Sequence, residues 1–235
     1  MARQKLVAEL VSQRSLLKEV RDGLSSILDL ERLAGRVAMD RAHGKNLQAL
    51  KLSLYAWLQV YQLVQHLNCS STDIAEVQKI ADLIQASIVD DPSILLTEGN
   101  LIKSGWSQEL DHLKSVRDNF GQILDEYVEE ERRCTGISTL KVRYNRVSGY
   151  YIEVSIGKID TVPAHFVLRR SMVNGNRYTT VRLQELEQEL NSADTGIVEL
   201  ERRLFLEVRD KVKEFTGYLF QVAKEIAYTD CIASL

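Results

Sequence analysis

Basic side chains gather in one stretch of this chain, residues 138–182. The stretch has eight lysine or arginine residues and only two acids, so its net charge is +6, whereas the whole chain has a formal net charge of −3. Basic side chains that neutralise phosphates release counterions, which gives affinity for nucleic acid without sequence preference. Basic residues also protect exposed strand edges from aggregation, so a solvated strand face is the alternative. The eight are Lys141, Arg143, Arg146, Lys158, Arg169, Arg170, Arg177 and Arg182.

Residue types that support catalysis are present but are not grouped as an active site would require. The chain has no G-x-x-x-x-G-K-[ST] phosphate loop and no G-x-S-x-G sequence. The acidic runs 90–91 and 129–131 fall in a predicted loop and at a predicted helix end, where acids are usually solvated. The sequence therefore predicts no enzyme activity, metal or cofactor for this chain, and a nuclease or other hydrolase has almost no support. The histidines lack the spacing of metal ligands: His43, His66, His112 and His165.

The basic stretch alternates apolar and polar residues as strands do. Two runs, 140–144 and 150–156, have this period of two, which puts the apolar set on one face and the polar set on the other. Residues 145–149 have the types that join strands as a hairpin. A third run, 166–173, leads to an Asn-Gly turn signal at 174–175. We therefore expect a small, mostly antiparallel β-module.

Residues 3–88, by contrast, are patterned for helices. Apolar residues recur there at steps of three or four, and we expect four helices. Gly23 is expected to interrupt the first helix, and Ser26, Asn46 and Asp73 are expected to cap the next three.

Two further helical stripes flank the β-module, at 107–133 and 183–226. Thr180 is the expected N-cap of the second stripe, and Gly196 and Gly217 could kink or break it. The predicted fold is mainly α with a small β insertion. It has a helical core plus long antiparallel helices that carry a small antiparallel β-module at their tip.

Composition also bears on the compartment. No run of about 18 apolar residues is present, so no membrane span is expected, and the first residues lack the apolar block of a signal peptide. Cys69, Cys134 and Cys231 are far apart and odd in number, which is typical of reduced thiols in a cytoplasmic protein.

Residues 140–154, LKVRYNRVSGYYIEV, closely resemble a segment of the MutS family of DNA mismatch repair proteins. Four other segments agree in the same order, so the resemblance spans essentially the whole chain: DLERLAGRVA (29–38), NLIKSGWSQELDHLK (100–114), TGISTLKV (135–142) and LRRSMVNGNRYTT (168–180).

The resemblance implies three parts and a larger protein around them. Residues 1–134 would be the helical core and outgoing lever arm, 135–182 the β-rich clamp, and 183–235 the returning lever helix. The family's mismatch-binding, connector and ATPase domains have no counterpart here, so the chain is expected to be a fragment. ATP and Mg²⁺ would belong to the absent ATPase domain. The implied partners are double-stranded DNA, including mismatched duplex, and a second subunit in a homodimer.

The resemblance also implies which residues contact the DNA backbone. Asn174 and Arg177 match the asparagine and arginine of the family's K-N-A-E-R-Y run, and Arg169 and Arg170 match its paired arginines. Val173 replaces the lysine of that run, and alanine and glutamate are replaced by Gly and Asn. The next candidates for DNA binding are Lys141, Arg143 and Arg146. A hypothesis of another class is a coiled-coil structural module whose basic β-tip docks an acidic protein partner.

Overall fold

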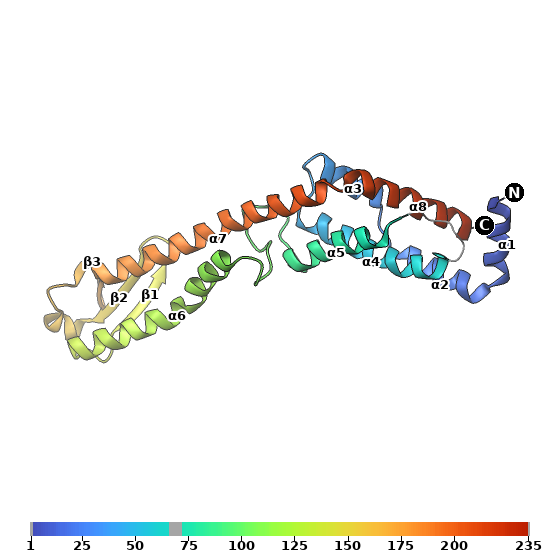
Figure 1. Cartoon of the computed structure of the whole chain (residues 1–235). Coiled ribbons are helices and arrows are strands. Elements are labelled where there is room, and N and C mark those ends of the chain that lie inside the picture. The colour runs from blue at the N-terminus through green and yellow to red at the C-terminus, as the bar shows by residue number, and fades with distance from the viewer. Residues whose placement is uncertain (1, 66–71, 235) are drawn as a thin grey trace. The chain divides into compact units, whose positions relative to one another are not determined.

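The computed structural model describes residues 2–65 and 72–234, which form two compact units. One unit comprises Met1–Trp106 and Val198–Leu235, and the other comprises Ser107–Ile197. The long helix α7 (Val181–Lys213) contributes residues to both (Figure 1). The three-part division expected from the sequence rests on composition and resemblance, and it stays a prediction. His66, Cys69 and most of the predicted loop at 68–72 lie outside the described residues.

The first unit is helical, with α4 at its centre. The apolar side of α4 is fully buried, including Leu50, Leu54 and Trp57, and α4 packs against α2, α3 and α5. Helix α8 packs against α2 and α3. The helices of this unit are α1 (Ala2–Ser12), α2 (Arg14–Ser25), α3 (Leu30–Ala38), α4 (Gly44–Val64), α5 (Ile74–Ser87) and α8 (Thr216–Ser234), with the last part of α7.

Several helix boundaries in this unit differ from the prediction. Gly23 does not interrupt a helix: it lies inside α2, where an added Cβ would come within 2.5 Å of Val60, so it permits a close helix contact. Asp29 rather than Ser26 caps α3, because its side chain accepts a hydrogen bond from the Arg32 amide.

The predicted cap at Asn46 is also wrong, since the N-cap of α4 lies three residues earlier. His43 occupies the N-cap position, and the Asn46 Oδ1 accepts a hydrogen bond from the His43 amide. The predicted cap at Asp73 is confirmed, because its side chain accepts a hydrogen bond from the Ala75 amide. The break in the last stripe lies at residues 214–215, just before Gly217, and separates α7 from α8.

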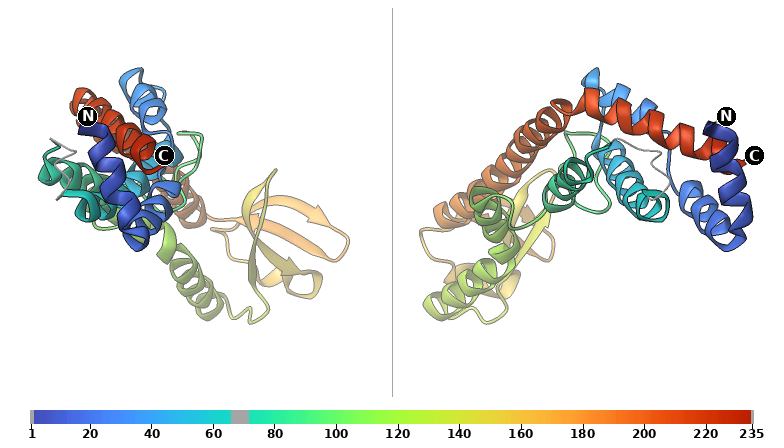
Figure 2. Two further views of the ribbon diagram at one scale, coloured as in Figure 1. Left: turned by 90° about the vertical axis from the view of Figure 1, so that its right-hand side faces the viewer. Right: turned by 45° about the vertical axis from the view of Figure 1, so that its right-hand side comes forward.

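The second unit joins two helices to a four-stranded antiparallel sheet of order β1-β2-β4-β3. Figure 2 shows this sheet, in yellow and orange, beside the green helix α6 from two further sides. The fold class predicted from the sequence is confirmed, with one strand more than expected. Its elements are α6 (Gln108–Thr135), β1 (Lys141–Asn145), β2 (Gly149–Ser155), the 3₁₀ helix η2 (Ile156–Thr161), β3 (Val167–Met172), β4 (Gly175–Thr179) and the start of α7.

One face of the sheet packs against α6 and α7, and this layer forms the core of the unit. Ile152 and Tyr178 on the sheet are buried in one cluster with Tyr127 of α6 and Leu186 of α7. Thr180 connects the layers: its hydroxyl accepts a hydrogen bond from the Leu183 amide, as predicted for the N-cap of α7, and lies 2.6 Å from the Tyr127 hydroxyl. Burial raises the pKa of Tyr127 to about 12, so this hydroxyl keeps its proton.

Candidate polyanion-binding face

The opposite face of the sheet carries charge. Because directly paired residues point to the same face, the strand register identifies its members. Lys141 pairs with Glu153, Glu153 pairs with Arg177, and Arg177 pairs with Arg170. This row crosses all four strands, and we call it, together with Arg143, the basic face. It contains four cations and one acid.

Two residues of the central strand β2 hold arginines of this face. The Arg143 Nε lies 2.7 Å from a Glu153 carboxylate oxygen, in an ion pair that is about half exposed on both sides. The Arg177 guanidinium carbon lies 4.3 Å from the centre of the Tyr151 ring. Tyr151 is only 5% exposed although the pleat places it on the polar side of β2. Arg143 and Arg177 therefore have defined positions before any ligand arrives.

Edge strand β3 presents the other two arginines differently. All six of its residues are exposed. A register shift occurs between Leu168 and Arg170, so that Arg169 is an extra residue opposite β4. Neither guanidinium forms an ion pair or a hydrogen bond with any residue in 2–65 or 72–234. Arg169 and Arg170 therefore have all their donors free for a ligand.

The remaining two predicted residues lie in turns at opposite ends of the sheet. Arg146 is exposed in the turn that joins β1 to β2, where the Asn145 side chain accepts hydrogen bonds from the amides of Val147 and Ser148, both 2.8 Å long. Asn174 is exposed in the turn between β3 and β4. The structure thus brings Lys141, Arg143, Arg170 and Arg177 together, with Arg169 beside them, and leaves Arg146 and Asn174 at the two ends.

The second of these turns differs from the prediction. It consists of Val173 and Asn174, and Gly175 already belongs to β4, paired with Met172 and Ser155. A Cβ on Gly175 would lie 2.4 Å from the Val154 carbonyl oxygen. The glycine is required by the close approach of two strands, so the Asn-Gly pair is not itself the turn.

Comparison with known proteins agrees with the limits of this unit. Residues 105–196 match the model of MutS family domain IV. Among curated proteins, DNA mismatch repair protein MutS of Treponema pallidum (strain Nichols) is 44% identical over 225 residues, which are 93% of this chain and 25% of that protein. The chain belongs to the MutS family.

Other relatives give the same result. The proteins of the same name from Treponema denticola and Aquifex pyrophilus are 39% and 38% identical over 90% and 99% of this chain. The chain spans about a quarter of the length of these curated relatives, 24% and 28%. The domain IV match at 105–196 nearly coincides with the structural unit at 107–197, so the basic face belongs to domain IV.

Sequence reasoning found the cations of domain IV but missed the two residues that hold them, Glu153 and Tyr151. Tyr150 packs into the core, with its ring 5.4 Å from that of Phe120, whereas the next tyrosine, Tyr151, lies on the basic face. The period of two separates the two tyrosines. However, only the pairing of β2 with the unforeseen β4 reveals that Arg177 covers Tyr151.

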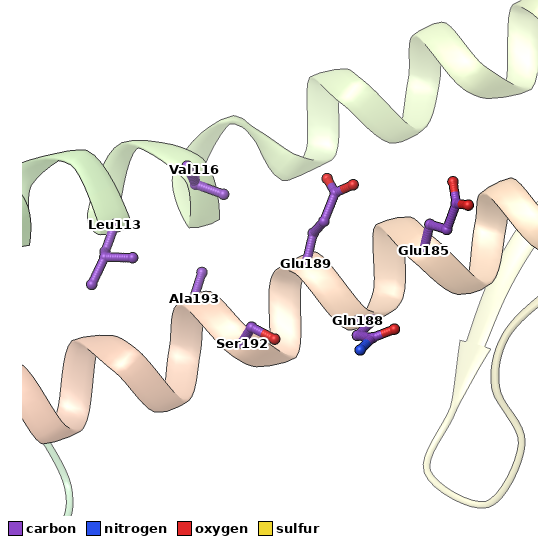
Figure 3. A pocket seen from close by; sticks show the side chains of 7 residues that line it. All are labelled: Leu113, Val116, Glu185, Gln188, Glu189, Ser192 and Ala193. Carbon is purple, nitrogen blue, oxygen red and sulfur yellow. The ribbon is translucent and has the colours of Figure 1, made fainter.

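Domain IV also has a groove between α6 and α7 that could hold a ligand (Figure 3). Its volume is about 610 Å³, and Leu113, Val116 and Ala193 form its apolar side. Its two carboxylates, Glu185 and Glu189, both form ion pairs with Arg182, at 3.3 and 3.2 Å. The lining has no histidine or cysteine, and Arg182 neutralises charge on both of its carboxylates.

Two further kinds of site are absent from the part of the chain that the structure describes. Residues 2–65 and 72–234 contain no group of three acid, histidine or cysteine side chains that could hold a metal ion. None of the helices described in the structure is long and apolar enough to cross a bilayer. Cys134 and Cys231 are free and exposed.

Proposed function

We propose that this chain is part of a DNA mismatch repair protein and that its basic face holds duplex DNA through contacts to the sugar-phosphate backbone. The observation that supports this most directly is the row Lys141, Arg177 and Arg170, with Arg143 beside it, on one side of one sheet. No base-reading element is needed, because contacts to phosphates position a protein without carrying sequence information.

The rest of the proposal concerns the whole protein. The seven residues proposed to contact phosphates are Lys141, Arg143, Arg146, Arg169, Arg170, Asn174 and Arg177. The full-length protein would act on mismatched duplex as a homodimer in the cytoplasm, and an ATPase domain outside this chain would bind ATP and Mg²⁺. This chain has no phosphate loop, so we assign none of its residues to ATP.

The salt dependence of DNA binding tests the proposal. If four to six charges engage phosphates, log Kobs should fall with log salt with a slope of about −4 to −5. The measurement is fluorescence anisotropy with a labelled duplex of about 30 base pairs, since the slope counts the phosphates that the protein neutralises. Matched and mismatched duplexes should give similar affinities for this chain.

A charge-reversal pair locates the contact. Arg169→Glu with Arg170→Glu should weaken binding by more than about tenfold and reduce the slope by about 2, because two phosphate contacts are lost. The matched control is Arg14→Glu with Arg32→Glu, which makes the same charge change at exposed positions of α2 and α3. Equal losses from both pairs would contradict a DNA site on the sheet. Failure of the wild-type chain to bind any duplex at low salt would favour an acidic protein partner instead.

A further inference from the structure

Tyr151 is the one aromatic residue paired within the basic face, and its ring is already covered. It is the register partner of Arg143 on β1, and the Arg177 guanidinium lies 4.3 Å from the ring centre. An exposed aromatic ring on a charged face can act as a stacking platform for bases of single-stranded nucleic acid. Because Tyr151 is 5% exposed, its ring has no free face to offer a base.

The covered ring leaves the hydrogen-bonding capacity of Arg177 intact. Arginine stacks on aromatic rings and still presents a planar fork of N–H donors that matches a phosphate. Arg177 forms no ion pair and no side-chain hydrogen bond within the described ranges. The ring contact therefore orients the cation without using the groups that a phosphate needs.

This arrangement contrasts with the edge strand. Arg169 and Arg170 are exposed and lose side-chain freedom only when they bind, whereas Arg177 is half-buried and loses most of that freedom on folding. Groups that are ordered beforehand cost less to immobilise in a complex, so they give more affinity for each contact.

We propose that Tyr151 is a positioning residue, whose ring fixes the Arg177 guanidinium for a backbone phosphate of duplex DNA. The inference rests on the proposed function, because it assumes that the basic face binds DNA. It goes further by assigning a role to a residue that does not itself touch the ligand. It also predicts that DNA affinity depends on the aromatic ring of Tyr151 and not on its hydroxyl.

Four variants of the 235-residue chain test this in the duplex anisotropy assay. Tyr151→Phe keeps the ring and should bind within about twofold of wild type. Tyr151→Leu should bind about three- to tenfold more weakly, the range expected for a cation–π contact. Arg177→Ala should weaken binding at least as much. The double variant should be no weaker than Arg177→Ala, since a ring with no arginine to hold has nothing to contribute.

Two further variants guard against a purely structural effect. Tyr144→Leu is the matched control, because Tyr144 is an exposed tyrosine of the same sheet whose ring contacts Tyr150 and not Arg177, and it should leave affinity unchanged. Arg177→Lys keeps the charge at an unaltered Tyr151 but loses the planar fork, and it should bind several-fold more weakly. This variant keeps the inference testable if Tyr151→Leu does not fold.

An NMR measurement without DNA separates the two proposals. The Arg177 Nε–Hε signal should shift and become more mobile in Tyr151→Leu but not in Tyr151→Phe. The inference is overturned if that signal is unaffected, if Arg177→Lys binds as tightly as wild type, or if the losses from Tyr151→Leu and Arg177→Ala add. Absence of duplex binding by the wild-type chain would overturn the proposed function and, with it, this role for Tyr151.

Discussion

Replacing Glu153 by glutamine should strengthen DNA binding, because this carboxylate is the one acid paired within the basic face. Its oxygen lies 2.7 Å from the Arg143 Nε. A phosphate that binds the same guanidinium at about 2.8 Å would lie about 6 Å from the carboxylate. Two unit charges about 6 Å apart repel by about 0.7 kcal/mol in water and about 2.8 kcal/mol at an effective dielectric constant of 20.

Exposure and screening reduce that repulsion. The ion pair is about half exposed, and a Debye length of about 10 Å at 0.1 M salt weakens the interaction further. We therefore expect a gain of about 0.5–1.5 kcal/mol, which is about two- to tenfold tighter binding. Loss of the ion pair should alter folding stability by at most about 1 kcal/mol, since exposed pairs contribute little.

The assay is duplex anisotropy in about 0.1 M salt, with Asp160→Asn as the matched control. Asp160 is the other acid of the stretch 138–182, and it lies in η2, outside the basic face. Glu153→Gln should tighten binding more than the control does, and the difference should shrink as salt is raised. Unchanged or weaker binding by Glu153→Gln, with the fold intact by circular dichroism, would refute the reasoning.

Three further predictions concern stability and are measured by thermal or denaturant unfolding. Thr180→Ala should cost about 1–3 kcal/mol, because it removes the cap of α7 and one hydrogen-bond partner of the buried Tyr127 hydroxyl, and Thr180→Ser should restore most of the loss. Gly175→Ala should cost about 1–3 kcal/mol through its clash with the Val154 carbonyl, and an alanine tolerated there would disprove that close approach. Burial lowers the pKa of His43 below 6.5, so the unfolded state takes up a proton first and stability should fall as pH drops below about 6.5. His43→Gln should remove that part of the pH dependence.

The sequence predicted the helices of the flanking stripes well because their signals are local. The cap at Thr180 and the hairpin at 145–149 need only neighbouring residues. The roles of two glycines were harder to predict, since the residues that require them are distant in the sequence. Gly23 lies against Val60, and Gly175 lies against Val154, so each permits a close contact that no local pattern reveals.

The residues of the basic face also include some that the sequence predicted and some that it did not. Composition and resemblance were enough to select the cations of the basic face, because charge can be counted. The fourth strand was missed because it begins at a residue that signals a turn. Without β4 in its place, the pairing of Glu153 with Arg177 and the contact between Arg177 and Tyr151 cannot be deduced. The roles of Glu153 and Tyr151 therefore required the sheet register.

The register shift in β3 has a consequence for transferring residue roles between relatives. Arg169 is the extra residue there. The number of residues in this strand therefore helps to decide to which face of the sheet each neighbouring side chain points. Deleting one residue from the strand would reverse the facing of every side chain on one side of the gap while barely altering composition. Two arginines of a homologue that align with Arg169 and Arg170 are thus structurally equivalent to them only where the homologue has the same extra residue in this strand.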